Sequence, residues 1–198
     1  MTLFLVRHGR TAANASGLLL GRLDPPLDDE GERQAAAVGD AIHGEAARGS
    51  RVISSPLVRC RTTAAAIAER LGLDVEVDER WIELDYGELD GVPLRDVPPD
   101  LWERWRADPE YVAGGGESLV ALGLRVRAAA DELAPDAATK DVVVVSHVSP
   151  IKAAVAWTLG VGDDIAWRLF LSPASITRVA VRGRHPSLVS FNDVSHLA

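Results

Sequence analysis

Two uninterrupted apolar runs, LFLV at residues 3–6 and VVVV at residues 142–145, constrain the fold of this chain more than any other feature. A strand with one face in water alternates apolar and polar residues, whereas a strand buried on both faces reads as a continuous apolar run. Helical patterns separate the apolar runs along the chain, so we expect right-handed crossovers between parallel strands. The sequence therefore predicts an α/β fold with a mostly parallel central sheet flanked by helices.

Local signals place the remaining elements. One helical pattern opens with Pro56 and closes on Gly72, as helices prefer. The expected strands are 2–6, 51–55, 74–78 and 141–147, with a final hairpin of 174–182 and 187–193 around the turn GRHPS. The expected helices are 28–48, 56–72, 116–134 and 149–160. The less regular segment 81–115 holds four prolines and three of the five tryptophans, and we expect a short helix and loops there. We interpret residues 1–198 as a single domain, a three-layer sandwich with 81–115 as an insertion or lid.

Composition narrows the classes of partner. The formal net charge of −8 argues against nucleic acid or an anionic membrane, since both need a basic face. No apolar run approaches the roughly 18 residues of a membrane span, and no signal-peptide pattern opens the chain. The lone cysteine, Cys60, excludes an intrachain disulfide and fits a reducing cytosol. We expect a soluble cytoplasmic protein, and an exposed sheet edge or the final hairpin could support a homodimer.

Basic and nucleophilic side chains stand where the expected strands end. Arg7 and His8 follow the first strand, and His147 follows the late one. Arg59 lies in the first turn of the helix after the second strand. Ligands of open α/β sheets bind at this edge. Arginine matches phosphate oxygens through its planar fork, and a histidine among cations favours its neutral, nucleophilic form. The constellation suits phosphoryl transfer through a phosphohistidine, with no metal or cofactor required.

Six ordered segments carry a family resemblance. RHGRTAAN at 7–14 resembles the RHG-x-T-x-x-N signature of the histidine phosphatase superfamily, the phosphoglycerate-mutase-like proteins. The segments that follow in the family's order are GRLDPPLDDEGERQA, SSPLVRCRTTA, ELDYGELDG, GGGES and VVVVSH. The resemblance covers essentially the whole chain and implies the phosphoglycerate-mutase-like fold.

The same resemblance implies roles for individual residues. It makes His8 the nucleophile and Glu83 the acidic proton donor, and it completes the catalytic set with Arg7, Arg59 and His147. Thr11 and Asn14 match the polar positions of the signature. The residues expected to bind substrate are Arg7, Thr11, Asn14, Arg59, Glu83 and His147.

Two departures from the family pattern bear on the pocket. The family most often has Glu or Gln after RHG, whereas this chain has Arg10, which either adds positive charge beside the pocket or, as we favour, points into solvent. The family usually has glycines after the second histidine, and this chain has Val148 and Ser149. Side chains there restrict the backbone and could narrow the pocket or shift the hydrogen bonds to phosphate.

Other reactive side chains have plainer interpretations. We expect His43, His185 and His196 at the surface, and Cys60 in the core because it lies in an apolar helical pattern. A metal could recruit His8 and His147, yet no Cys partner, H-x-x-x-H pattern or local Asp/His cluster accompanies them. No G-x-S-x-G elbow supports a serine nucleophile. Trp102 and Trp105, three residues apart, share a helix face and either pack on the core or wall the substrate pocket.

Three functions remain open at this point. The first is a phosphatase for a small phosphomonoester. The second is a phosphoglycerate mutase-type transfer, and the third is a non-catalytic phosphate-binding relative. Mutases resembling this family carry a lysine after their Y-G-x-x-x-G, whereas residues 86–100 here hold no lysine, only Arg95 and several acids. We therefore favour the phosphatase.

Overall fold

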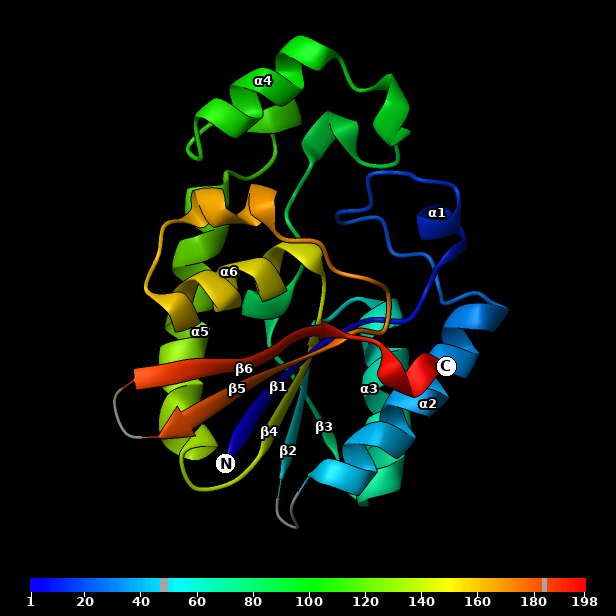
Figure 1. Cartoon of the computed structure of the whole chain (residues 1–198). Helices are drawn as coiled ribbons and strands as arrows, with labels where there is room; N and C mark the ends of the chain where they lie inside the picture. The colour runs from blue at the N-terminus through cyan, green and yellow to red at the C-terminus, as the bar shows by residue number, and fades with distance from the viewer. Residues whose placement is uncertain (47–49, 183–184) are drawn as a thin grey trace.

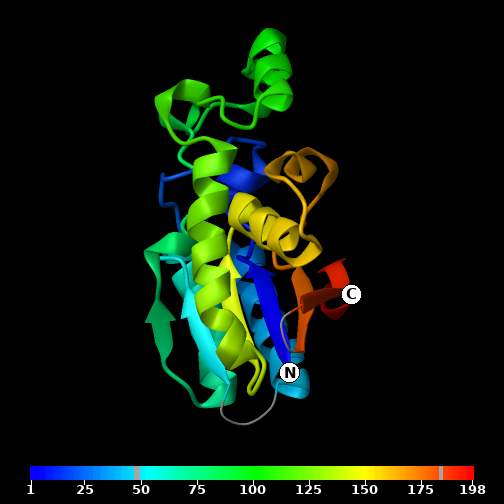
Figure 2. The same ribbon diagram turned by 90° about the vertical axis from the view of Figure 1, so that its left-hand side faces the viewer.

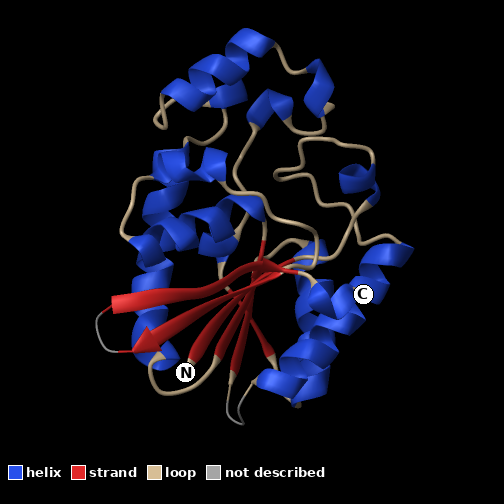
Figure 3. Cartoon of the chain, in the orientation of Figure 1, coloured by secondary structure: helices blue, strands red, loops and turns tan. Residues whose placement is uncertain are grey.

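The computed structural model describes residues 1–46, 50–182 and 185–198. Within these ranges one sheet runs in the order β3-β2-β4-β1-β5-β6 (Figures 1 and 3). Its strands are β1 (Thr2–Arg7), β2 (Arg51–Ser54), β3 (Val75–Val77), β4 (Val142–Ser146), β5 (Ile176–Arg182) and β6 (His185–Asp193). The strands β1 to β4 are parallel, β5 pairs antiparallel with β1, and β6 pairs antiparallel with β5. The prediction of a mostly parallel α/β sheet is confirmed.

Alternate residues of the central strands face two separate cores, as strands buried on both faces require. The helices are α1 (Ala12–Ala15), α2 (Asp29–Glu45), α3 (Val58–Leu71), α4 (Pro99–Ala107), α5 (Leu119–Ala137) and α6 (Val148–Leu159). Leu3 and Leu5 of β1 pack into the core that α5 and α6 share. Phe4 and Val6 pack into the core under α2 and α3. The sheet is thus the middle of three layers (Figure 2).

Capping residues explain where several helices begin and end. Asp28 accepts a hydrogen bond from the Gly31 amide at 2.8 Å and starts α2. Ser118 accepts one from Ala121 N at 3.1 Å, so α5 begins at Leu119 rather than at the predicted residue 116. Gly72 ends α3 in the left-handed conformation, with φ of 66°. The helix α2 ends at Glu45, whereas the sequence predicted a helix to residue 48. The last two residues of that prediction, 47 and 48, lie outside the described residues.

The end of the chain differs from the prediction. β6 begins at His185, two residues earlier than expected, because Arg182 and His185 are still paired across the hairpin. The rest of the predicted GRHPS turn, residues 183–184, lies outside the described residues. His196 does not point into solvent as expected, since its Nε2 donates to the Ala174 carbonyl oxygen at 3.0 Å.

The segment 81–115 forms the expected short helix and loops. Its helix α4 stands beyond the edge at which the parallel strands end, on the far side of α6 from the sheet (Figures 1 and 2). Short 3-10 turns flank it at Glu79–Trp81, Gly87–Leu89, Leu94–Asp96 and Ala113–Gly115, and two more lie at Asp163–Arg168 and Ser195–Leu197. Among the described residues, no helix is long and apolar enough to cross a membrane.

Candidate active site

The ends of β1 and β4 place two imidazoles side by side. Arg7 pairs in register with Ser146, and the His8 amide donates to the Ser146 carbonyl at 3.0 Å. The rings of His8 and His147 are therefore 5.1 Å apart between centroids and meet at 63°. His8 is 2% exposed and His147 is fully buried. Parallel register thus produces the paired histidines that the sequence placed at two strand ends.

Backbone geometry fixes the orientation of His8. Its Nδ1 lies 2.7 Å from the carbonyl oxygen of Gly9, which can only accept a hydrogen bond, so Nδ1 carries the proton. Nε2 then keeps its lone pair. Burial, followed by the charges of Arg59 and Arg7, holds the pKa of His8 well below its ordinary value. The imidazole is therefore neutral at neutral pH, as expected of a nucleophile.

Packing leaves no space for a side chain at Gly9, the residue after His8. A Cβ on Gly9 would collide with the carbonyl oxygen of Gly31 in the first turn of α2. A Cβ on Gly31 would collide in turn with the carbonyl oxygen of Arg10. These two glycines let the loop after β1 lie directly on the start of α2, which holds His8 at the strand end.

His147 is held by residues that the sequence did not single out for this role. The Ser55 hydroxyl oxygen lies 2.7 Å from its Nε2, and Cys60 Sγ lies 3.3 Å from the same atom. Ser55 directly follows β2, so the strand-end argument that found His8 could have found it too. Burial raises the pKa of the Cys60 thiol, which confirms Cys60 as a core residue and keeps it protonated. Burial and Arg59 also hold the pKa of His147 well below its ordinary value.

Two buried guanidinium groups share this site. Arg7 Nη1 donates to the Leu171 carbonyl at 2.6 Å. Arg59 donates to the carbonyls of Leu23 and Gly21 at 2.7 and 2.8 Å. Burial lowers the pKa of Arg7 to about 10 and lowers that of Arg59 as well, so both remain charged at neutral pH. The two cations are thus held mainly by neutral carbonyls.

The Nε atoms of both arginines lack a hydrogen-bond partner among the described residues, although they are buried. A buried charged donor left unpaired is costly, and such groups are normally satisfied by a ligand or a counter-ion. Arg59 also has Asp24 at 3.7 Å, but that carboxylate is 41% exposed and only partly compensates the charge. Arg7 and Arg59 therefore form a site suited to an anion beside His8.

Glu83 joins this group from the segment after β3. Its carboxylate accepts hydrogen bonds from the amides of Leu84, Val148 and Ser149, at 2.7, 3.1 and 3.1 Å. His147 is the residue before α6, so Glu83 is anchored on the first turn of the helix that carries the second histidine. Val148 and Ser149, the departure from the family's glycines, thus present their amides to a carboxylate within the protein.

The other acids near Glu83 have different surroundings. Asp90 accepts hydrogen bonds from Gly21 N and Leu23 N, both at 2.8 Å, so it supports the loop that binds Arg59. Asp85 Oδ1 accepts from the Gly87 amide at 2.8 Å. Glu88 is exposed. Glu83 is the member of this acidic segment that is buried beside α6.

Thr11 and Asn14 bind one another in this structure. Thr11 Oγ1 accepts from Asn14 N at 3.2 Å, and Asn14 Oδ1 accepts from Thr11 N at 3.1 Å, which caps α1. Arg10 lies nearby but donates to Asp28 at 2.9 Å with 41% of its side chain exposed. The added cation is thus paired with Asp28 at the start of α2 and is partly exposed to solvent.

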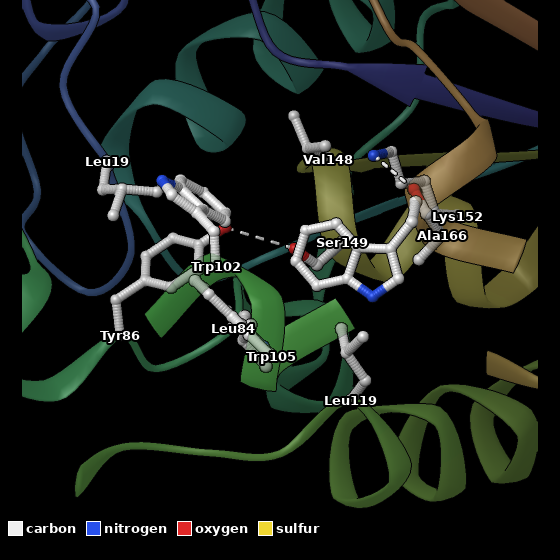
Figure 4. Close-up of a pocket in the computed structure, with 11 residues that line it drawn as sticks. Leu19, Leu84, Tyr86, Trp102, Trp105, Leu119, Val148, Ser149, Lys152 and Ala166 are labelled. Atoms are coloured by element: carbon white, nitrogen blue, oxygen red, sulfur yellow. Dashed lines mark hydrogen bonds between the residues drawn. The ribbon is translucent and has the colours of Figure 1, made fainter. Parts of the chain in front are cut away.

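A pocket of about 390 Å³, part of it open to solvent, adjoins Glu83 (Figure 4). Leu84, Val148 and Ser149 line it, and all three contact the Glu83 carboxylate through their amides. Trp102 and Trp105 both line it, and Trp105 is also buried in the core, so the expectation of core packing is confirmed for Trp105. The sequence did not identify Lys152, Tyr86 and Trp167 as lining residues.

The remaining histidines lie outside this site. His43 on α2 and His185 on β6 are exposed, as expected. Across residues 1–46, 50–182 and 185–198, no group of three or more His, Cys, Asp or Glu side chains is arranged to hold a metal ion.

Comparison with known proteins places this geometry in a family. The model of the histidine phosphatase superfamily (branch 1) matches residues 3–194. The chain belongs to this superfamily. It is 33% identical over 199 residues to phosphoserine phosphatase 1 of Hydrogenobacter thermophilus, covering 98% of this chain and 93% of that protein.

Solved structures and a longer relative agree with this assignment. A mutant phosphoserine phosphatase of Entamoeba histolytica, in complex with phosphoserine, matches with a TM-score of 0.90 at 28% identity, covering 100% of this chain and 99% of that one. The chain is also 37% identical, over 88% of its length, to a bifunctional protein of Mycobacterium tuberculosis. It spans only 49% of that relative's length.

Proposed function

We propose that this histidine phosphatase superfamily member hydrolyses a small phosphomonoester through a phosphohistidine on His8. One observation carries the proposal: His8 presents an unprotonated Nε2 next to two buried arginines whose Nε atoms have no partner among the described residues. A neutral nucleophile beside a buried, doubly cationic anion site is the arrangement that phosphoryl transfer to histidine requires. The family and its phosphatase relatives support the same activity.

The proposed reaction has two steps. In the first, His8 Nε2 forms a bond to phosphorus, the bond from phosphorus to the ester oxygen breaks, and the carboxyl group of Glu83 gives that oxygen a proton. Arg7, Arg59 and His147 stabilise the charge on the equatorial oxygens. In the second step, water attacks phosphorus, Glu83 takes a proton from it, and the bond to Nε2 breaks. Inorganic phosphate and the alcohol are the products, and His8 is restored.

We also propose the wider setting of this reaction. The chain acts as one domain whose segment 81–115 covers the site, and Thr11 and Asn14 turn toward the phosphate when substrate binds. The chemistry needs no metal, because the two arginines supply the positive charge. The single cysteine, which cannot form an intrachain disulfide, supports work in a reducing cytosol.

A mutase is the second candidate function. A mutase must keep its phosphorylated intermediate from water, which requires further cations and cover over the pocket. The segment 86–100 offers only Arg95, and its side chain is 86% exposed and lies beside Asp96 at 3.6 Å. Arg95 therefore gives the mutase little support, and hydrolysis is favoured.

Product analysis tests the proposal. Purified protein is incubated with 3-phosphoglycerate and, separately, with a panel of phosphomonoesters, while inorganic phosphate and the phosphoglycerate isomers are measured. Release of phosphate without isomerisation supports the phosphatase. Isomer formation without phosphate release would establish the mutase instead, and neither product with any ester would leave a phosphate-binding protein.

A further inference from the structure

The pocket beside Glu83 is placed to receive the alcohol part of a substrate. We name it the tryptophan pocket, after Trp102, Trp105 and Trp167, which line it together with Tyr86, Ser149 and Lys152. Tyr86 Oη lies 3.4 Å from Ser149 Oγ, and the Ser149 amide binds Glu83 at 3.1 Å. A phosphate held by the arginines beside His8 would therefore direct its ester oxygen to Glu83 and its organic group into this pocket.

The pocket wall is aromatic, and its rings meet one another both face to face and edge to face. Trp102 and Trp105 on α4 stack with ring centroids 5.4 Å apart and an interplanar angle of 13°. Trp167 meets Trp105 edge-on at 5.4 Å, and Tyr86 also meets Trp105 edge-on at 5.7 Å. Packed rings of this kind keep their orientation and offer apolar surface at little entropic cost. A small polar alcohol would leave that surface against water, whereas a broad apolar body would cover it.

The polar groups of the pocket are mainly donors. Lys152 is the charged residue among the eleven that line it, and none of those eleven is acidic. Its ammonium, which has three donors, gives one to the Ala166 carbonyl at 2.8 Å. The indole N–H groups of Trp105 and Trp167 are buried and lack an acceptor among the described residues. Burial lowers the pKa of Lys152, so an incoming anion would offset a desolvated charge.

Resting on the phosphatase function above, we propose that the tryptophan pocket selects phosphomonoesters whose alcohol part combines an apolar body with a carboxylate that Lys152 binds. Lys152 would repel a cationic group, whereas a carboxylate would accept a charge-assisted hydrogen bond from its ammonium. Lys152 lies three residues after Ser149 on α6, so both side chains face the pocket from one helix face. Lys152 is thus a specificity residue distinct from the phosphate-binding arginines.

Matched esters test this proposal. The kcat/KM is measured for phenyl phosphate, its 3- and 4-carboxyl derivatives and ethyl phosphate. We expect Lys152→Met to reduce kcat/KM for the better carboxyl derivative roughly tenfold more than for phenyl phosphate, as loss of a charge-assisted contact implies. Lys152→Arg should retain the preference. Trp102→Ala should penalise the aryl esters more than ethyl phosphate. The only other lysine, Lys140, lies at the end of α5 beside Asp136, so Lys140→Met is the matched control.

Binding of non-hydrolysable analogues separates this proposal from the phosphatase function. Calorimetry measures phenylphosphonate and its carboxyl derivatives with wild type, Lys152→Met and Lys152→Gln. A loss of affinity specific to the carboxyl derivatives supports the proposal even if no ester is hydrolysed, an outcome that would refute only the phosphatase. Equal losses for phenylphosphonate and its carboxyl derivatives would overturn the role of Lys152. If Lys152→Met fails to fold, Lys152→Gln decides in the same way.

Discussion

Nδ1 of His8 and the carbonyl oxygen of Gly9 are 2.7 Å apart, and this contact determines which nitrogen of the imidazole can react. The carbonyl cannot donate, so the proton lies on Nδ1 and the lone pair on Nε2. The contact also fixes the plane of the ring beside His147. A local backbone acceptor thus selects the tautomer, with no carboxylate needed to hold the ring.

The first prediction concerns the phosphorylated atom. Rapid quenching with a labelled substrate should trap an acid-labile phosphoryl group on His8 Nε2, because Nδ1 is occupied by Gly9. Phosphorus NMR of the quenched protein distinguishes the two nitrogens. His8→Ala should abolish both label and turnover while the fold survives, and His43→Ala is the exposed control. Label on Nδ1, or on another residue, would refute the assignment.

The second prediction concerns the buried arginines. Arg7→Ala or Arg59→Ala should remove several kcal/mol of transition-state stabilisation, because a charge-assisted contact is lost in a buried site. The expected decrease in kcat/KM is roughly 10²- to 10³-fold. Steady-state kinetics measure the effect, and circular dichroism checks the fold. Arg61 lies two residues beyond Arg59 and is exposed, so Arg61→Ala should change little. Near-normal kcat/KM in either variant would place that arginine outside the phosphate site.

The third prediction concerns Glu83 as general acid. An alkoxide is a poor leaving group without a proton, whereas para-nitrophenolate departs readily. Glu83→Gln should therefore slow phosphoenzyme formation from an alkyl phosphate by about 10²- to 10⁴-fold and affect para-nitrophenyl phosphate far less. Single-turnover kinetics are needed, because the shared hydrolysis step could mask the difference.

Glu88→Gln is the control for this experiment, because Glu88 lies in the same segment and is exposed. Equal losses on both substrates in Glu83→Gln would mean that Glu83 positions the start of α6, through the amides of Val148 and Ser149, without donating a proton.

The fourth prediction concerns stability and pH. Burial and two arginines hold the pKa of His8 well below its ordinary value, so near pH 6 the unfolded chain binds a proton that the folded protein does not. The free energy of unfolding should therefore decrease as pH falls below about 6.5, by at most about 1.4 kcal/mol for each pH unit per histidine. His147 contributes with the same sign.

Urea unfolding of wild type, His8→Asn and His43→Asn at about pH 7.5 and about pH 5.5 measures this contribution. His8→Asn should lose less stability on acidification than wild type, because one of the two buried histidines is gone. The exposed His43 should make no difference. The same dependence on pH in all three proteins would show that His8 takes up a proton in the folded state.

The sequence by itself determined the layers and the strand ends. The apolar runs at 3–6 and 142–145 specify strands buried on both faces, and parallel strands bring their carboxyl ends to one edge. His8 and His147 could therefore be placed together from the chain alone. The RHG segment also includes Gly9, where the first turn of α2 leaves no space for a side chain.

Only the tertiary structure decided how the side chains meet. Ser55 contacts His147, which lies 92 positions further along the chain. Glu83 accepts a hydrogen bond from the Val148 amide of α6, which lies 65 positions further along. The tryptophan pocket likewise assembles Trp102, Lys152 and Trp167 from three separate elements. Local propensity and periodicity report neighbours along one strand or helix, whereas these contacts depend on how helices and loops pack over the sheet. The identity of the residues beside the phosphate was readable from the chain, but the shape and charge of the pocket for the rest of the substrate were not.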